Sequence, residues 1–343
     1  VPGMPAPSRL QRRTPTGAAE PAARINVNDG ASREYVQYLE GQQSQSESRV
    51  FATIGHRLDV ERRMTHALNG VVARMTDAEA AVVRALPDVR LVEEYREYEQ
   101  DTDVGPTLIG APQLWNAPSS PVKGEGIVFG IIDSGINFGS PSFAATDETG
   151  YTHVNPRGNG HYLGTCAADG IDKGRCNSKL IGGYDFVCQA PGDACANPDY
   201  REEPGFGDTN GHGSHTASTA AGNARTVQFR GREVRISGVA PRANIVAYDV
   251  CYTNLTTGRG LCPNVSSVAA VDQAIADGVD VINFSIGGGD QPWSDAVSLA
   301  FLSATDAGIY VATSAGNSGP AANSLGHLEP WTGSSAAAQH GRG

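Results

Sequence analysis

Apolar runs of strand length alternate with helical patterns from about residue 104 onward, and this alternation limits the folds open to the chain. The runs are short and unbroken, as in "GIVFGIID", "ANIVAYDV" and "IYVATSAGN", and segments such as "SSVAAVDQAIADG" between them place apolar residues at helical spacing. Strands that are apolar on both faces are typical of a parallel sheet covered by helices on each side. We therefore predict an α/β fold with a parallel sheet for this part of the chain.

Polar residues follow three of these runs. Asp133 closes "GIVFGIID", Ser285 comes directly after "VDVINF", and Asn317 follows "IYVATSAG". Open parallel sheets bind their ligands beyond the carboxyl ends of the strands. We therefore expect Asp133, Ser285 and Asn317 to lie along one edge of the sheet, and the functional site to be there.

The overall charge and hydropathy argue against two classes of partner. The 343 residues carry a net charge of −11, with 26 Lys and Arg against 37 Asp and Glu. Phosphate binding requires clustered Lys and Arg, so we expect no nucleic-acid partner. No apolar run approaches the roughly 18 residues of a membrane helix, so we also expect no membrane span.

Six cysteines fall into three close pairs within loop-like sequence rich in Gly, Asn and Asp. A metal site is the rival interpretation, but the C-x-x-C spacing of zinc sites is absent and no histidine accompanies the pairs. We favour local disulfides, which indicate an oxidising and therefore secreted setting. Residues 1–13 contain no apolar core for a signal peptide, so we expect that signal to be missing from this sequence. The pairs are Cys166 with Cys176, Cys188 with Cys195, and Cys251 with Cys262.

The first 103 residues differ in pattern from the rest. Residues 1–22 are rich in Pro, Ala and Arg without a period and predict a disordered leader. Residues 23–103 predict a small α+β domain with a helix that Ser32 caps, a strand at "GVVARM", a helix that Thr76 caps, and a strand at "VRLVEEY". An acidic, extended tail follows these elements and ends the domain.

Two stretches place catalytic residue types beside small residues. His212 lies in "NGHGSHTAS" between Gly211 and Gly213, which leave backbone room around the ring. Asp133 at the end of a buried strand needs a partner that offsets its desolvation, and a histidine ring is a good one. Alternatively, Asp133 and His212 only cap the turns beside them, or His212 and His215 bind a metal, although the Glu of the H-E-x-x-H motif is absent.

Asn317 lies in "SAGNSGP" and offers an amide N–H that could stabilise an oxyanion, although Asn beside Gly is also common in plain turns. In that order, "GIIDSGI", "GHGSHTAS" and "SAGNSGP" resemble the motifs of the subtilisin-like serine proteases. Asp, then His, then Ser is the chain order of that family. The resemblance covers residues from about 104 to 332 and predicts the family's parallel-sheet catalytic domain.

The resemblance implies a role for each matching residue. Asp133 would orient the histidine, His212 would act as the general base, and Asn317 would donate to the oxyanion. The substrates would be proteins or peptides, and the reaction would require no cofactor. A structural calcium ion is compatible with the family, but its ligands are not readable from the sequence. The stretch "NFSIGGG" resembles the segment that pairs with an extended substrate, which implies substrate contacts at Ser285, Ile286 and Gly287.

Residues 23–103 resemble the N-terminal propeptide of this family. The resemblance implies that the protein's own propeptide assists folding and then inhibits the active site, with cleavage between about Glu99 and Val104. The insertion with cysteines between Asp133 and His212 resembles the larger bacterial members. In those members a protease-associated domain commonly interrupts the chain before the catalytic serine.

The serine of the triad has no convincing match. The family's nucleophile lies in G-T-S-M-A-x-P at the start of a long buried helix, and Ser335 in "GSSAAAQ" lacks both the Met and the Pro. Only 18 positions separate Asn317 from Ser335, which is too few, because each parallel crossover needs about a dozen residues or more. We therefore expect the serine to be missing, and residues 333–343 to be an aberrant tail after a truncation or frameshift near Thr332.

These features predict the precursor of a secreted subtilisin-like endopeptidase with an incomplete catalytic domain, inactive as given. One alternative is a protease-like protein without catalysis that binds extended peptides, and another is an inactive fragment. A third is a metal-dependent hydrolase that uses Asp133, His212 and His215.

Overall fold

The computed structural model describes residues 27, 29–95, 97–98, 109–119, 121–188, 193–229, 232–318 and 323–336. The predicted leader (1–22), the expected cleavage region (99–104) and the end of the predicted tail (337–343) lie outside the described residues. Within the described ranges, no helix is both long enough and apolar enough to cross a bilayer.

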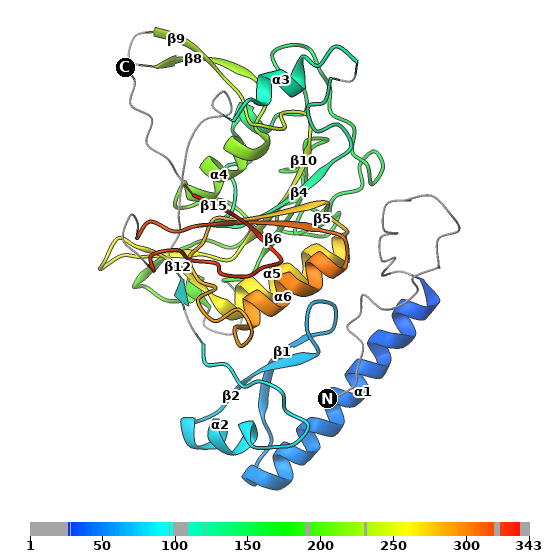
Figure 1. Cartoon of the computed structure of the whole chain (residues 1–343), viewed down its shortest axis with the longest axis vertical. Helices are drawn as coiled ribbons and strands as arrows, with labels where there is room; N and C mark the ends of the chain where they lie inside the picture. Colours follow the sequence, from blue (N-terminus) through cyan, green and yellow to red (C-terminus); the bar gives the residue numbers. More distant parts are fainter. Residues whose placement is uncertain are drawn as a thin grey trace.

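A seven-stranded sheet forms the centre of the larger region (Figure 1). Its strands run in the order β15-β14-β13-β4-β10-β6-β5, and all neighbours pair in parallel. The predicted α/β fold with a parallel sheet is therefore confirmed. The strands are β4 (Val128–Asp133), β5 (Leu163–Gly164), β6 (Leu180–Asp185), β10 (Asn244–Asp249), β13 (Val281–Phe284), β14 (Tyr310–Ser314) and β15 (Gly333–Ser335).

Helices cover the sheet and enclose two hydrophobic cores. Helices α5 (Asn264–Asp277) and α6 (Ala296–Asp306) contribute to one core, and α4 (His212–Ala221) contributes to the other. Gly278 ends α5 as its C-cap, with a left-handed φ of 64°. The apolar residues of α5 at helical spacing are all buried, namely Val268, Ala269, Val271, Ala274 and Ile275.

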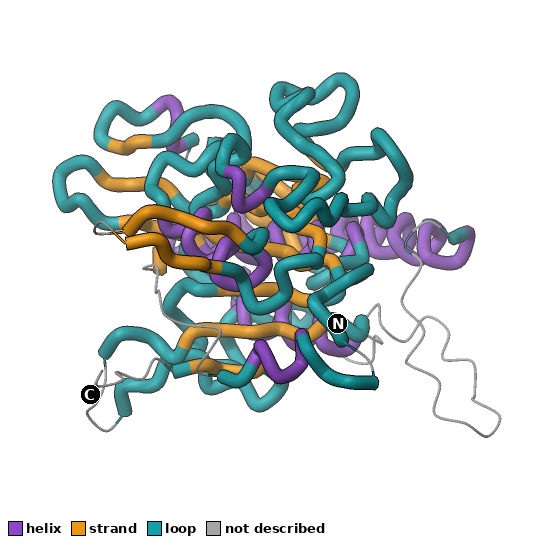
Figure 2. The backbone as a smooth tube through the Cα atoms, turned by 90° about the horizontal axis from the view of Figure 1, so that it is seen from above, coloured by secondary structure: helices purple, strands orange, loops and turns teal. Residues whose placement is uncertain are grey.

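Shorter elements surround the sheet, and loops make up much of the backbone around the strands (Figure 2). A four-stranded sheet has the order β3-β12-β11-β7, and β8 and β9 form a separate hairpin at the top of Figure 1. These strands are β3 (Glu97–Tyr98), β7 (Tyr200–Arg201), β8 (Arg225–Phe229), β9 (Arg232–Ile236), β11 (Tyr252–Asn254) and β12 (Gly260–Pro263). The short helices are α3 (Ala111–Trp115), η2 (Pro141–Phe143) and η3 (Ala194–Ala196).

All six cysteines are bonded in the structure. The bonds join Cys166 to Cys176, Cys188 to Cys195, and Cys251 to Cys262, which are the pairs predicted from the sequence.

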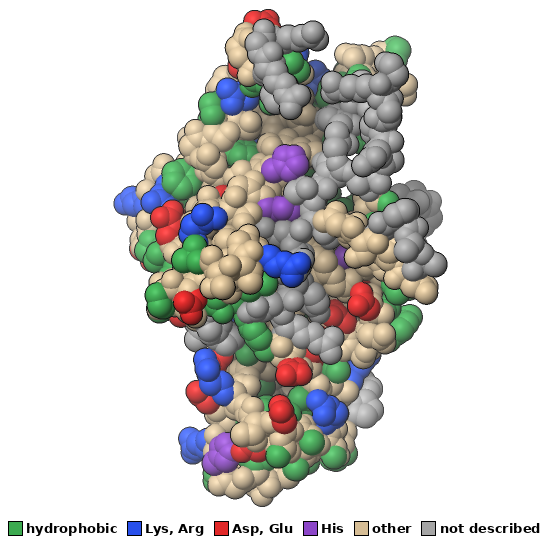
Figure 3. All heavy atoms as spheres, turned by 90° about the vertical axis from the view of Figure 1, so that its left-hand side faces the viewer, with side chains coloured by type: hydrophobic (Ala, Val, Ile, Leu, Met, Phe, Trp, Pro, Cys, Tyr) green, Lys and Arg blue, Asp and Glu red, His purple; other side chains and the backbone are tan. Residues whose placement is uncertain are grey.

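An N-terminal module lies below α5 and α6 in Figure 1. Its capping prediction at Thr76 is confirmed, because Thr76 and Glu79 form a reciprocal capping box. The prediction for Ser32 is wrong: Asp29 is the N-cap, and its carboxylate accepts from the N–H of Ser32 at 2.7 Å. Figure 3 shows acidic and basic side chains close together on this module, at the bottom of the view. The elements are α1 (Gly30–Ile54), β1 (Asp59–Met64), β2 (Gly70–Arg74) and α2 (Asp77–Arg84).

The strand predicted at "VRLVEEY" is also wrong, because residues 89–95 join no sheet. The polar groups of this segment bond to the sheet region instead. The carbonyl of Glu94 accepts from the Asn264 amide at 3.0 Å, and the Glu93 carboxylate accepts from the N–H of Ala296 at the start of α6. An apolar, β-branched run predicts extended backbone, but only its hydrogen-bond partners decide whether it forms a strand.

Candidate active site

The side chains of Asp133 and His212 meet at the carboxyl end of β4. Asp133 is the last residue of β4 and is fully buried, and its Oδ1 atom lies 2.7 Å from Nδ1 of His212. The carboxylate also accepts from the N–H of Ser134 at 2.8 Å and from the hydroxyl of Thr216 at 3.0 Å. These hydrogen bonds offset the cost of burying the charge.

A tight turn places His212 at the start of α4. The Asp208 carboxylate accepts from the N–H groups of Asn210 at 3.0 Å, Gly211 at 2.6 Å and Ser214 at 2.8 Å. The side chain of Asn210 accepts from the N–H of His212 at 3.2 Å. Asp208 and Asn210 therefore cap the turn, and the His212 ring is directed to Asp133.

Small residues bring α4 close to the end of β4. A Cβ atom on Gly213 would lie 2.2 Å from the carbonyl oxygen of Gly135, closer than real Cβ contacts come. Any side chain at Gly213 would therefore push the first turn of α4, and His212 with it, away from Asp133. This contact gives a physical reason for glycine beside the histidine.

The geometry defines the chemistry available to the pair. A carboxylate that accepts from Nδ1–H fixes the ring tautomer, so that Nε2 is the nitrogen that can take up or release a proton. The same carboxylate stabilises the ring when it becomes positively charged. The His212 side chain is 9% exposed and that of Asp133 is 0% exposed, so this attraction acts with little screening by water.

The other predicted site residues lie at the same edge of the sheet. In the strand order β14-β13-β4, Ser285 directly follows β13 and Asn317 comes three residues after the end of β14. Asn317 is exposed, whereas the side chain of Ile286 is fully buried. Ile286 can therefore face a ligand only with its backbone.

Comparison with models of known protein families identifies the family of this chain. The model of the Subtilase family matches residues 124–338, a stretch that includes Asp133, His212, Ser285 and Asn317. The chain belongs to the Subtilase family. This match agrees with the parallel sheet and with the Asp–His pair at its carboxyl edge.

Two plant subtilases show how much of the protein is similar. The chain is 36% identical over 287 residues to Subtilisin-like protease SBT2.1 of Arabidopsis thaliana, which covers 81% of this chain and 33% of that protein. It is 35% identical over 285 residues to SBT2.5 of the same plant, covering 80% of this chain and 34% of that protein. The chain thus spans about a third of the length of these relatives. Among solved structures, fervidolysin from Fervidobacterium pennivorans is 16% identical, with a TM-score of 0.48, and the match covers 84% of this chain and 40% of that chain.

The serines near the end of this subtilase chain lie in a strand. Ser334 and Ser335 belong to β15, which pairs in parallel with β14 and continues the sheet from Gly333. The hydroxyl of Ser334 donates to the carbonyl of His327 at 2.8 Å. Neither serine starts a helix, which is where the nucleophile was expected. The first residues of the predicted tail, 333–335, therefore pair with β14 through their backbone. Their side chains are not the apolar ones that are typical of an inner strand.

Sequence reasoning missed two aspartates that lie level with Asp133. The strand register places Asp249 of β10 opposite both Asp133 of β4 and Asp185 of β6. Burial, with the nearby charges of Glu202 and Asp185, raises the pKa of Asp249 well above its usual range. Burial also raises the pKa of Glu202 to about 8. The available signal was that "NIVAYD" ends in an acid just as "VFGIID" does.

Sequence reasoning also missed strand β12, which lies between β3 and β11 in the four-stranded sheet. Strand β3, which follows the N-terminal module in the chain, pairs with it in antiparallel register, Tyr98 opposite Cys262 and Glu97 opposite Pro263. The disulfide from Cys262 to Cys251 ties β12 to the chain just beyond β10. The cysteine pair was visible in the sequence, but its role in holding a pairing edge was not.

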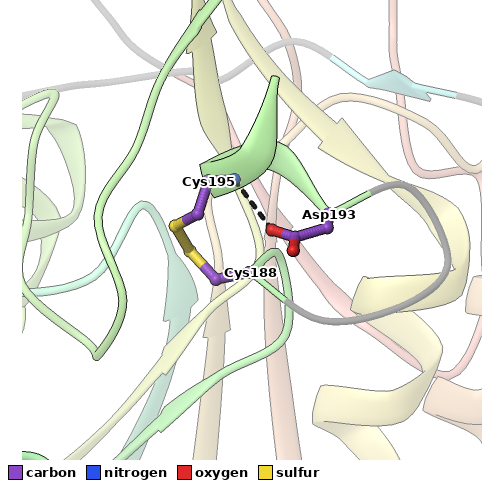
Figure 4. A group of neighbouring side chains, drawn as sticks. All are labelled: Cys188, Asp193 and Cys195. Atoms are coloured by element: carbon purple, nitrogen blue, oxygen red, sulfur yellow. Dashed lines mark hydrogen bonds between the residues drawn. A yellow bond between two sulfur atoms is a disulfide. The ribbon is translucent and has the colours of Figure 1, made fainter. Parts of the chain in front are cut away.

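Within the described residues, the geometry does not bring together the ligands of either metal interpretation from the sequence. Among the described residues, only Cys188, Asp193 and Cys195 bring three ligand atoms within 4.8 Å of one another (Figure 4). Their two sulfurs are bonded to each other, and the Asp193 carboxylate accepts from the N–H of Cys195 at 3.0 Å. Zinc binds thiolates, which a disulfide does not offer. His215 forms no such group with His212 and Asp133 in the described part of the chain.

Proposed function

We propose that this chain carries the propeptide and part of the catalytic domain of a subtilisin-like serine endopeptidase, which hydrolyses peptide bonds with an Asp-His-Ser triad. The observation that carries the proposal is the 2.7 Å contact between the buried Asp133 carboxylate and Nδ1 of His212. Membership of the Subtilase family supports the same chemistry.

In the proposed mechanism, Nε2 of His212 takes the proton of a serine hydroxyl as that oxygen attacks the peptide carbonyl. His212 then gives the proton to the leaving amine, while Asp133 holds the ring and stabilises its charge. The amide of Asn317 donates to the oxyanion that forms at the attacked carbonyl. Acid–base chemistry of side chains is sufficient for these steps, so the proposed reaction needs no cofactor.

The nucleophilic serine in this proposal lies outside residues 1–343, so that this chain alone hydrolyses no peptide. The strand position of Ser334 and Ser335 supports this assignment, since a strand residue whose hydroxyl already donates to a carbonyl is poorly placed for attack. Sequencing the coding DNA past the codon for Thr332 is the direct check. A segment that encodes G-T-S-M-A in any of the three frames is expected, and its absence from all three would contradict the assignment.

Residues 23–103 act as an intramolecular inhibitor in this proposal, with cleavage between about Glu99 and Val104. The antiparallel pairing of β3 with β12 supports this role, because extended peptides commonly bind by adding a strand to an exposed edge. The module is also held by Asp272 of α5, whose carboxylate accepts from the N–H groups of His66, at 2.7 Å, and Ala67. A peptide substrate would take the place of β3 after its removal.

The substrates proposed are proteins and peptides in extended conformation, and the three disulfides support a secreted location. The alternative is a protein of the same family that binds extended peptides without cleaving them. Both readings use the same peptide-binding edge, and they differ in whether His212 reacts as a base and nucleophile.

A peptidyl chloromethyl ketone tests the site in the chain as it exists. Nε2 of His212 should displace chloride from the reagent's methylene carbon, which leaves one alkylated histidine that peptide mapping can locate. The His212→Ala variant should lose this adduct, and Asp133→Asn should slow it strongly, since the wrong ring tautomer then prevails. Asp272→Ala should speed it, because the module's tail then competes less for the edge.

Three results would overturn parts of the proposal. An adduct that survives His212→Ala would show that the reagent reacts elsewhere. No adduct in the wild type and in Asp272→Ala would contradict the proposed reactivity of His212 and favour the protein that binds peptides without cleaving them. Stoichiometric labelling of Ser334 or Ser335 by a fluorophosphonate would show that the nucleophile is present in this chain.

A further inference from the structure

A second buried histidine lies behind the segment expected to bind substrate. The His327 and Glu329 side chains are 1% and 0% exposed, and Nδ1 of His327 lies 3.0 Å from Oε1 of Glu329. The hydroxyl of Ser298 on α6 donates to the same carboxylate oxygen at 2.7 Å. The proposed mechanism uses neither His327 nor Glu329.

His327 donates hydrogen bonds to the carbonyl groups of two alternate residues in the segment that follows β13. Its Nε2 donates to the carbonyl oxygen of Ile286 at 2.7 Å, and its backbone N–H donates to that of Gly288, also at 2.7 Å. A carbonyl oxygen only accepts a hydrogen bond, so Nε2 carries the proton of the hydrogen bond to Ile286. One residue therefore holds this segment through both its ring and its main chain.

The backbone of His327 is in an unusual conformation. Its φ of 56° lies in the left-handed region, which among the described residues other than glycine only Asn323 shares. Such a conformation costs on the order of 1 kcal/mol or more and persists where the surroundings enforce it, often at functional sites. The ring also packs edge-on against Phe284, the last residue of β13, at 5.5 Å between centroids.

Glu329 holds the ring in place. Burial would raise the pKa of Glu329, but hydrogen bonds from His327 and Ser298 and the attraction of His327 lower it below its usual value. Gly289 makes room for the carboxylate, because a Cβ there would lie 2.6 Å from Oε1 of Glu329. A carboxylate behind one ring nitrogen orients the other nitrogen toward its target.

The same short stretch also reaches the segment that carries Asn317. The N–H of Gly326 donates to the carbonyl of Ala315 at 3.0 Å, and the N–H of Leu328 donates to that of Gly289 at 3.1 Å. Residues 326–329 therefore connect the two strand-end segments that hold the proposed substrate contacts and the proposed oxyanion donor.

We propose that His327 is a positioning residue for peptide binding. By holding the carbonyls of Ile286 and Gly288 on the inner side, it turns the backbone N–H and C=O groups of Ser285 and Gly287 outward. Polar groups of alternate residues in extended backbone point to opposite edges, and the outer edge is the one that an added peptide strand uses. The inference rests on the proposed function, since it concerns the same peptide site.

Two substitutions separate the contacts of the ring. In His327→Asn the amide can replace Nδ1 beside Glu329 but does not reach Ile286, and Asn tolerates the left-handed backbone. In His327→Gln the amide nitrogen can replace Nε2 and keep the bond to Ile286. His161→Asn is the matched control, because His161 is exposed.

Two measurements on the full chain test the proposal. Hydrogen exchange of residues 281–290 reports the positioning, and alkylation of His212 by the peptidyl chloromethyl ketone gives the half-saturating concentration, KI, and the limiting rate, kinact. His327→Asn should speed the exchange and raise KI about tenfold with kinact nearly unchanged, the scale of one lost hydrogen bond. His327→Gln should stay within about threefold of the wild type, and His161→Asn should match it.

The outcomes separate this inference from the function on which it rests. Faster exchange with an unchanged KI would make His327 structural only and overturn the proposal, as would unchanged exchange in His327→Asn. A change in kinact alone would place the effect at His212, and this would also contradict the proposal for His327. If the wild type forms no adduct at His212, the proposed function fails, whereas exchange in the two variants still decides whether His327 positions the segment.

Discussion

Helix α1 of the N-terminal module and helix α5 of the region around the seven-stranded sheet show how differently these two regions are stabilised. Helix α5 of the sheet region buries ten of its 14 residues, whereas α1 of the N-terminal module buries four of its 25, and two of those are Ser32 and Gln43. A hollow of about 1490 Å³ lies between the regions, lined by residues of both such as Leu39 and Leu299. The sheet region depends on dense packing, whereas the described part of the module adds only Met64 and Ala67 to that buried core and is joined to it by directed polar contacts such as those of Asp272.

The largest expected effect comes from replacing a glycine by alanine, which should have opposite effects on stability in the two regions. Gly213→Ala should lower the free energy of unfolding of the sheet region by about 2–3 kcal/mol, because the new methyl group meets the Gly135 carbonyl. Gly41→Ala should stabilise the module by about 0.5–1 kcal/mol, because a Cβ at Gly41 in α1 meets nothing within 4 Å and alanine favours helix.

Urea unfolding measures both effects. All three tryptophans, Trp115, Trp293 and Trp331, lie in the sheet region, so their fluorescence follows that region, while far-ultraviolet circular dichroism also reports α1. Destabilisation by both substitutions would mean that α1 is packed as tightly as the sheet region, which would break the comparison.

The sequence predicted the densely packed region better than the module, for a physical reason. Buried strands and helices such as β10 and α5 are specified by the periodicity of their own apolar residues. The path of residues 89–95 depends instead on partners far away in the chain, such as Asn264 for the Glu94 carbonyl. Such partners leave no local pattern.

The next effect concerns the contact that joins the regions. Asp272→Ala removes the acceptor of two backbone N–H groups at His66 and Ala67, so docking of the module should weaken by about 1–3 kcal/mol. Hydrogen exchange in β1 and β2 should speed up while the midpoint followed by tryptophan fluorescence stays near that of the wild type. Asp290→Ala is the control, because Asp290 is exposed. A large fall of the tryptophan midpoint would show instead that the sheet region needs the module.

The smallest effect is a response to pH that has the same sign in the two regions: the free energy of unfolding should fall in both as pH rises. The hydrogen bond with Asp272 raises the pKa of His66, so its contribution is complete below about pH 6.5 and is lost as pH rises through the raised value. The difference between wild type and Asp272→Ala should therefore shrink toward alkaline pH. In the sheet region, burial raises the pKa of Asp249, so the stability that its neutral form provides is lost as pH rises.

Asp249→Asn keeps the shape of the neutral acid and does not titrate. Its stability relative to the wild type should therefore increase as the pH rises above about 4, the usual pKa of Asp, as measured by urea unfolding followed by tryptophan fluorescence. A constant difference across this range would mean that Asp249 is not buried among charges as the structure describes.

The candidate site was predictable in part. Asp133 and His212 were found because each lies in a short motif and at the junction of two recognisable elements, and the structure brings them within 2.7 Å. His327 was not found, because its role depends on a left-handed backbone and on Glu329, and neither follows from local periodicity. The pairing of β3 with β12 likewise joins segments more than 150 residues apart in the chain.

The three disulfides each join cysteines at most 11 positions apart, and all six cysteines lie between residues 166 and 262. No covalent crosslink therefore connects the N-terminal module to the rest of the molecule. One cut in the backbone between residues 99 and 165 produces two separate polypeptides without any reducing agent. After that cut, concentration and competing ligands decide how long the two pieces remain associated.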